Sequence, residues 1–193
     1  VTGDANDYVG KGLSGATIVI KPPIESNLVS SENTIIGNTV LYGATSGKLF
    51  AAGQSGERFA VRNSGAEAVI EGCDSNGCEY MTGGSVVILG KIGDNFAAGM
   101  TGGMAFIYDP DQEFENYVNS SSVTWQIPET DYWKDYLKKL IDEHYKVTQS
   151  KIAYKILKNY NDEVGNFKQA CPKEMLDKLS NPLSLKTKIS KAV

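Results

Sequence analysis

A short phrase recurs along the first half of the chain, and its period limits the folds that the chain can adopt. Each copy closes with a hydroxyl residue followed by glycine, and five successive closing glycines lie 9, 9, 18 and 19 residues apart. A repeat of this kind is typical of solenoids, in which each coil stacks on the next. The five copies close at Ser46-Gly47, Ser55-Gly56, Ser64-Gly65, Thr82-Gly83 and Thr101-Gly102, and an earlier one closes at Ser14-Gly15.

Short runs of β-branched and other apolar residues lie between the glycines and predict short strands. A period of 18 to 19 residues holds three such strands with their turns, and coils stacked about 4.8 Å apart pair each strand with its counterparts. The expected fold class is an all-β solenoid, a parallel β-helix, and the handedness of parallel crossovers favours right-handed winding. The predicted strands are Ala16–Ile20, Ile35–Ile36, Thr39–Tyr42, Lys48–Ala51, Phe59–Val61, Ala68–Ile70 and Ser85–Leu89.

Glycine is expected at the corners of such coils for two reasons. A sharp corner needs a positive φ, which glycine adopts at little cost. Corners of neighbouring coils also stack backbone on backbone, which leaves little room for a Cβ. The recurrent glycines are therefore expected to mark the corners.

The glycines fit a nucleotide-binding loop or a hexapeptide solenoid less well. Gly10-x-Gly12-x-x-Gly15 has the spacing of a dinucleotide-binding loop. That loop precedes a helix, whereas Gly15 precedes a β-rich run. A left-handed hexapeptide solenoid fits Ile36–Gly43, but its six-residue step fails in the next four residues.

Glycine and lysine divide the chain in two. Nineteen of the 20 glycines lie between Gly3 and Gly103, whereas four lysines precede residue 110 and 13 follow it. This shift predicts a β-helix domain over residues 1–110, a linker and C-terminal α-helical tail over residues 111–182, and a mobile basic tail over residues 183–193. One further strand is expected over residues 122–125.

The helical spacing of apolar residues predicts helices in the tail. The first covers residues 131–145, with Thr130 as its N-cap and His144 on its apolar face. Ser150 is expected to cap a second helix. Pro172 is expected to open a third, short helix that ends at Leu179.

Charge and hydropathy exclude several classes of protein. The formal net charge is −4 and the isoelectric point is near 5.1, which argues against nucleic acid, because nucleic-acid binding needs a concentrated basic face. No apolar run approaches the roughly 18 residues that span a bilayer. The first residues have neither the basic flank nor the apolar run of a signal peptide. We expect no nucleic-acid and no membrane partner.

The three cysteines are an odd number, which argues against a disulfide framework and favours a reducing compartment. Cys73-x4-Cys78 supplies only two of the roughly four soft ligands that a zinc or iron–sulfur site needs. We therefore expect Cys73, Cys78 and Cys171 to be free thiols, and no metal site.

No catalytic constellation is visible. His144 is the only histidine, and a lone histidine on the apolar stripe of a helix is more often packed than a base or a ligand. No serine or cysteine stands beside a recognisable base. We expect no catalytic residue in this chain.

Six charged residues interrupt the repeat. The simpler interpretation is that they point outward as solvated or salt-bridged groups. A sharper hypothesis is that Arg58 and Arg62, the only arginines, anchor a contact with another domain, together with Glu57 and Glu79. The planar fork of arginine suits interfaces because it makes bidentate pairs. The six are Glu57, Arg58, Arg62, Glu67, Glu71 and Glu79.

Five stretches closely resemble the C-terminal domain of the glutamate synthase large (alpha) subunit, which is named for its Gly-x-Gly-x-Gly repeats. The helical region follows the closing pattern of that family in Leu140-Ile-x-x-His144 and Thr148-x-Ser150. The resemblance covers nearly the whole chain. The five stretches are Gly3–Gly15, Asn38–Gly47, Gly56–Gly65, Gly77–Gly84 and Asn95–Gly103.

The resemblance implies a right-handed β-helix with a non-catalytic, structural role in an oxidoreductase of glutamate biosynthesis and ammonia assimilation. That family converts glutamine and 2-oxoglutarate into two glutamates, with a glutaminase domain and a domain that carries FMN and an iron–sulfur cluster. None of their catalytic residues matches a position here, so we expect no cofactor on this chain. The implied partners are these two domains and an electron donor protein or small subunit, in the cytoplasm or a plastid.

Two further assignments stay open at this point. A standalone β-helix subunit related to one found in formylmethanofuran dehydrogenase shares the repeat. A solenoid polysaccharide lyase needs an acidic and basic cluster along one groove, for which Asp7, Lys11, Arg58 and Arg62 are the candidates. Because the family's β-helix has coils before the string that starts at Gly3, we expect this chain to lack N-terminal coils and to be a fragment of a longer polypeptide. The helical tail favours glutamate synthase.

Overall fold

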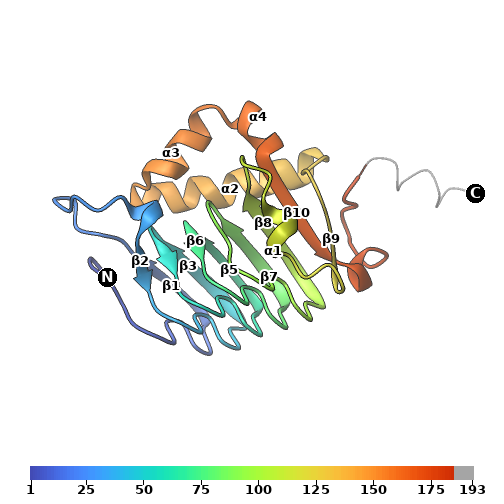
Figure 1. Ribbon diagram of the computed structural model, residues 1–193, viewed down its shortest axis with the longest axis horizontal. Coiled ribbons are helices and arrows are strands. Elements are labelled where there is room, and N and C mark those ends of the chain that lie inside the picture. Colours follow the sequence, from blue (N-terminus) through green and yellow to red (C-terminus); the bar gives the residue numbers. More distant parts are fainter. Residues whose placement is uncertain (185–193) are drawn as a thin grey trace, which may run out of the picture.

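The computed structural model describes residues 1–184, and its centre is a β-solenoid of about four turns (Figure 1). Each coil gives one long strand to a main sheet, in which these strands pair in parallel. The register places Phe50 between Val19 and Val69, so equivalent residues of successive coils stack in columns. The predicted all-β solenoid is thereby confirmed. The parallel strands are β1 (Ser14–Ile20), β3 (Ser46–Ala51), β5 (Ser64–Ile70), β7 (Thr82–Ile88) and β8 (Gly102–Tyr108).

A second side of the coils forms a smaller parallel sheet. Its strands are β2 (Thr34–Ile36), β4 (Gln54–Ser55) and β6 (Gly72–Cys73). The ladder goes one step beyond β6, because the amide of Cys73 donates a hydrogen bond to the carbonyl of Lys91. The two-residue strands β4 and β6 are too short to show an alternation in the sequence.

The third side is built from turns, so the strands predicted at Thr39–Tyr42 and Phe59–Val61 are wrong. Each coil has three residues of positive φ here, two apart in sequence, as at Arg58, Ala60 and Arg62 (φ 59°, 58° and 54°). Their amides still bond to neighbouring coils: Arg58 donates to the carbonyl of Ser75, and Ala60 to that of Val40. These bonds offset the cost of the backbone conformation. Glycine was expected at the corners for its positive φ, but residues other than glycine, such as Arg58 and Ala60, adopt that conformation here.

The closing glycines are needed for close backbone approach, the second reason expected from the sequence. A Cβ on Gly65 or Gly83 would lie closer than 3.0 Å to a carbonyl oxygen of the preceding coil, at Thr45 or Ser64. Gly102 meets the carbonyl of Thr82 in the same way. None of these three glycines has a positive φ.

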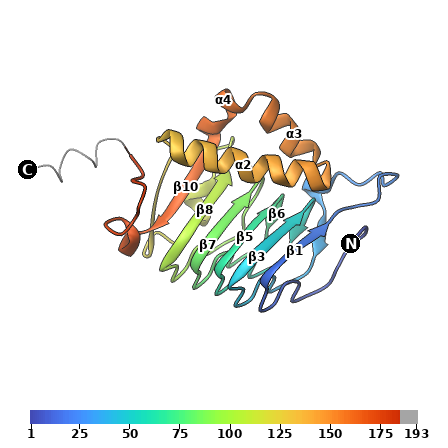
Figure 2. The same ribbon diagram turned by 180° about the vertical axis from the view of Figure 1, so that it is seen from behind.

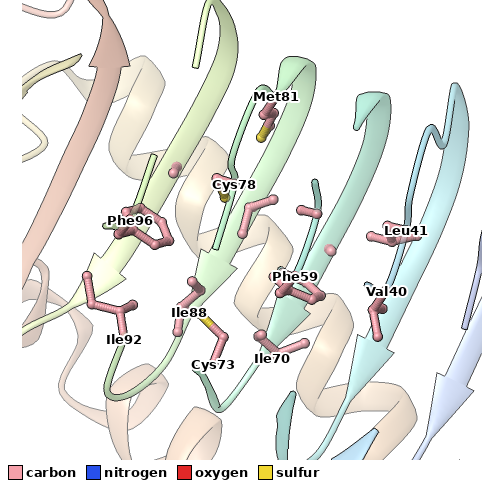
Figure 3. Close-up of a cluster of buried hydrophobic side chains, with 14 of the residues drawn as sticks. Val40, Leu41, Phe59, Ile70, Cys73, Cys78, Met81, Ile88, Ile92 and Phe96 are labelled. Carbon is pink, nitrogen blue, oxygen red and sulfur yellow. The ribbon is translucent and has the colours of Figure 1, made fainter. Parts of the chain in front are cut away.

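The interior of the solenoid is filled from two sides. Figure 3 shows Leu41, Phe59 and Cys78 reaching inward from the turns, opposite Ile70 and Ile88 from the main sheet. All five side chains are completely buried. The middle residue of each positive-φ triplet points inward, which explains why Leu41, Ala60, Cys78 and Ala97 are apolar.

Helices cover the outer face of the main sheet (Figure 2). The long helix α2 (Asp131–Thr148) crosses the sheet, and α3 (Lys151–Lys158) and α4 (Tyr160–Glu163) follow it. Leu137, Leu140 and Ile141 of α2 pack with outward residues of the strands. The central strands β5, β7 and β8 are therefore mostly buried on both faces, as their nearly continuous apolar runs suggest.

The capping predictions have different outcomes. Ser150 caps α3 as predicted, because its Oγ accepts a hydrogen bond from the amide of Ala153. Thr130 occupies the N-cap position of α2, but its side chain makes no capping bond.

Antiparallel strands complete the main sheet beyond β8. Strand β10 (Phe167–Pro172) lies between β8 and β9 (Val123–Gln126), which confirms the strand expected near residues 122–125. The short helix α1 (Phe114–Tyr117) precedes β9. The third helix predicted from Pro172 is wrong: Pro172 ends β10, and only a short 3-10 turn (Lys173–Met175) follows.

Pro172 pairs with Val123 of β9, and the amide of Lys173 donates a hydrogen bond to the carbonyl of Ser122, so contacts with the β9 segment hold the start of the range predicted to be helical. Of the predicted mobile tail, residues 185–193 lie outside the described residues. Leu183 is the first residue of the predicted tail, and its carbonyl accepts a hydrogen bond from the side chain of Gln126. The predicted domain boundaries stay predictions.

Candidate functional site

The four predicted contact residues lie on the side of the coils that is built from turns. We call this side the turn face and define it as residues 8–12, 39–43, 57–62, 76–80 and 95–99. Arg58 and Arg62 occupy the first and third positive-φ positions of one coil, and Glu79 lies in the next coil. The amide of Arg62 donates to the carbonyl of Glu79 (3.0 Å), and the amide of Thr39 donates to that of Glu57 (2.8 Å). The backbone thus holds all four residues in a rigid ladder.

The charged groups of the turn face are available for a partner. Glu57, Arg58 and Arg62 are exposed and Glu79 is half-buried. Within residues 1–184 none of the four side chains makes an ion pair or a hydrogen bond. An unpaired guanidinium on a rigid backbone can form a bidentate pair with a carboxylate at small entropic cost.

Tyrosine also marks the turn face. Tyr8 and Tyr80 are 55% and 53% exposed. The ring of Tyr80 packs on Gly99, where a Cβ would overlap it. Tyrosine and arginine are enriched at protein interfaces, so the face has the composition of a contact surface.

The four residues considered for a polysaccharide lyase do not form a cluster. Asp7 accepts a hydrogen bond from the amide of Asn38, and Lys11 lies over the ring of Tyr8, 5.5 Å from its centroid. Arg58 and Arg62 lie two coils further along. No hydrogen bond or ion pair in the described part of the chain joins Asp7 or Lys11 to either arginine.

A second group of polar residues is buried between the solenoid and the helices. Glu71, His144 and Ser150 are 0%, 0% and 2% exposed. The hydroxyl of Ser150 donates to Glu71 Oε1, and His144 Nε2 lies 3.9 Å from the same oxygen. The expectation that Glu71 points outward is wrong, whereas Glu67 is salt-bridged to Lys48 as expected.

Burial determines the chemistry of this group. Desolvation lowers the pKa of His144 below its ordinary value, and Glu71 opposes that shift. Ser150 is committed to Glu71 and to the cap of α3, and the histidine ring packs beside Phe50. The prediction of a packed histidine is confirmed. The sequence did not mark Glu71 as buried because it lies at the corner between β5 and β6, outside any alternating pattern, and residues distant in sequence cover it.

The cysteines are free and buried. Burial raises the pKa of Cys73 to about 12 and that of Cys171 to about 11, and it also raises the pKa of Cys78. These thiols are poor nucleophiles and poor metal ligands as they stand. The part of the chain that the structure describes holds no cluster of three or more potential metal ligands and no helix long and apolar enough to cross a membrane.

Comparison with known proteins gives a consistent result. The GXGXG motif family matches residues 1–173. The chain is 62% identical over 190 residues to the glutamate synthase [NADPH] large chain of Azospirillum brasilense, an alignment that covers 98% of this chain and 12% of that protein. It is 52% identical over 170 residues to the ferredoxin-dependent glutamate synthase of Pyropia yezoensis, which covers 88% of this chain and 11% of that protein.

A third relative, the glutamate synthase [NADPH] large chain of Bacillus subtilis, is 44% identical over 180 residues, with 93% of this chain and 12% of that protein covered. The chain thus spans about an eighth of the length of these relatives. The repeat that organises the sequence, the coils that it builds and the matched residues agree: the chain belongs to the GXGXG motif family and is homologous to one segment of the glutamate synthase large chain.

Proposed function

We propose that the chain is a non-catalytic structural domain of a glutamate synthase, wound as a right-handed β-helix. Its role is to hold the glutaminase and FMN-binding domains of the same enzyme at a fixed spacing while they make glutamate from glutamine and 2-oxoglutarate. The observation that carries the proposal is the 62% identity to a glutamate synthase large chain over 98% of this chain. The burial of His144 supports it, because this histidine, the only one in the chain, is completely enclosed.

The turn face is the proposed contact with the neighbouring domains. Arg58 and Arg62 are its anchors, with Glu57 and Glu79 beside them. FMN and an iron–sulfur cluster belong to the neighbouring domain in this proposal, and electrons arrive from a donor protein or a small subunit. The proposed location is the cytoplasm or a plastid, which accords with relatives that include a chloroplastic enzyme of Spinacia oleracea.

The contact is tested by mixing the chain with the separately produced remainder of the large chain and measuring the affinity between them by calorimetry. We expect Arg58→Ala/Arg62→Ala to weaken binding by at least about tenfold, since arginines at the centre of an interface commonly contribute more than 1.4 kcal/mol. Lys151→Ala/Lys155→Ala on α3 is the control that removes the same charge from another surface. Equal affinities of the two double variants would refute the contact.

The structural role has its own test. The isolated chain should show no flavin absorbance and no turnover of glutamine, with or without 2-oxoglutarate and a reductant. Glutamine hydrolysis by the purified chain would overturn the proposal, provided that an unrelated chain purified in the same way is inactive.

A further inference from the structure

A cavity of about 440 Å³ lies where the long strands end and the small sheet begins. Residues that follow β7 and β8 line it, and Ile152 of α3 and Phe114 of α1 also contribute to its wall. Pockets for small ligands commonly have about 300 to 1,000 Å³. Leu89, Ile107 and Phe114 are almost fully buried and give the cavity an apolar wall.

The polar part of the wall is strongly acidic. Lys91 is the only basic residue among the described residues that line the cavity, and five carboxylates oppose it. The cavity therefore favours a cation over a neutral or anionic ligand. The five carboxylates belong to Glu32, Glu71, Asp109, Asp111 and Glu113.

Two of these carboxylates are buried and incompletely paired. Asp109 is 8% exposed, and its Oδ1 accepts hydrogen bonds from the amides of Glu113 (2.8 Å) and Phe114 (3.3 Å) at the start of α1. Its Oδ2 has no hydrogen-bond partner within residues 1–184. Glu71 Oε1 accepts from Ser150, and Glu71 Oε2 likewise has no partner there. A buried acceptor without a donor is costly, so these two carboxylates leave uncompensated negative charge beside the cavity.

The chemistry of the wall selects an organic cation over a metal ion. The described residues contain no cluster of three or more groups placed to coordinate a metal. A guanidinium or ammonium group supplies several N–H donors to separate carboxylate oxygens, and an alkyl stem matches Leu89 and Ile107. We propose that the cavity is a binding site for a guanidinium or ammonium group carried on an apolar stem. This site is independent of the turn face.

The test uses the whole chain and two probes of nearly equal shape, n-butylguanidinium and its neutral isostere n-butylurea. Saturable one-to-one binding of the cation is expected in NMR titrations of isotope-labelled protein. The amides of residues 89–92 and 107–114 should shift. Equal binding of the urea, shifts confined to other residues or the absence of saturable binding would overturn the proposal.

Three substitutions test the charge of the cavity. Asp109→Asn keeps the Oδ1 acceptor for α1 and removes the charge, so it should weaken binding by at least about tenfold. Glu113→Gln removes an exposed carboxylate of the same wall and should weaken binding less. Lys91→Gln removes the opposing charge and should strengthen binding.

A control substitution and a check on folding complete the design. Glu174→Gln, which removes an exposed carboxylate that does not line the cavity, should leave binding unchanged. Thermal unfolding checks that each variant is folded, and if Asp109→Asn is not, Glu113→Gln and Lys91→Gln decide by their opposite signs. Identical affinities for these two variants would contradict the site.

A last comparison identifies the source of the cation. The probes are free n-butylguanidinium and a short glycine-rich peptide with one central arginine. Binding of the peptide about tenfold or more tighter assigns the site to a side chain of a protein segment, and equal or weaker binding assigns it to a small free cation. If neither binds, the proposal fails.

Discussion

At the scale of single residues, the most consequential polar contact is buried between the solenoid and the helices. Glu71 comes from the junction of β5 and β6, His144 from α2 and Ser150 from the cap of α3. Neither ring nitrogen of His144 has a hydrogen-bond partner in the described part of the chain. Protonating this ring therefore places a charge in a site that is closed to water.

His144 predicts how stability depends on pH. Desolvation lowers its pKa in the folded state below the 6.5 of a free histidine. The unfolded chain therefore binds more protons as the pH falls through that value, so stability is present above it and is lost below it. We expect the free energy of unfolding in urea to fall by about 1 kcal/mol between about pH 7 and about pH 5.5.

The control for this prediction is His144→Gln, because His144 is the only histidine in the chain. This variant should lose most of the pH dependence in the same range, whatever its overall stability. If His144→Gln leaves the change of the free energy of unfolding with pH unaltered, another group is responsible for that change.

At the scale of elements, a polar latch formed by Lys48, Glu67, Tyr136 and Glu143 complements the apolar contact between α2 and the main sheet. Lys48 of β3 bonds to Glu143 of α2 (2.5 Å) and to Glu67 of β5 (3.2 Å). The hydroxyl of Tyr136, on α2, donates to Glu67 (2.7 Å). The hydrogen bond to Glu143, above all, raises the pKa of Lys48. The latch fixes where α2 lies along the strands, which apolar packing alone specifies less strictly.

Lys48→Met tests the latch. It leaves two carboxylates facing each other without their cation, so we expect a loss of about 1 kcal/mol in the free energy of unfolding. The loss should shrink between about 0.1 M and about 1 M salt, because salt screens the remaining repulsion. Lys139→Met is the control, since Lys139 is 65% exposed and 4.0 Å from Glu143. Equal losses in the two variants would mean that the latch contributes nothing specific.

At the scale of the whole molecule, the spacing between the backbones of successive coils repeats along the solenoid. The closing glycines let each coil approach the carbonyls of the coil before it, and the inter-coil ladders of all three sides depend on that spacing. A substitution at one closing glycine therefore affects the packing of two neighbouring coils. This spacing also sets the positions of the turn face and of the outer face under α2.

Gly83→Ala tests the importance of the spacing. The added methyl group would overlap the carbonyl of Ser64, which is backbone and cannot rotate away. We expect a loss of about 3 kcal/mol in the free energy of unfolding, at the upper end for overpacked sites. Gly165→Ala should change stability by less than about 0.5 kcal/mol, because nothing lies within 4 Å of a Cβ there. Similar losses at the two positions would show that the coils adjust readily.

The sequence alone predicted the solenoid, most strands of its main sheet, the capped start of α3 and the packed histidine. These features are local: a fixed period, β-branched runs between glycines and a serine at a helix start. The sequence also singled out Arg58 and Arg62. Only the fold shows that their backbone amides bond to the next coil and that their side chains have no partner within the described residues.

Tertiary structure decided what local signals could not. Thr39–Tyr42 has the composition of a strand, but stacking between two coils holds it in positive-φ turns. Pro172 resembles a helix start, yet it pairs with Val123 of β9 as the last residue of β10, and only a 3-10 turn follows it. Glu71 has the character of a surface charge until α2 and α3 cover it. In each case hydrogen bonds and burial supplied by residues distant in sequence outweighed the local preference, which is a fraction of a kilocalorie to a few kilocalories per mole.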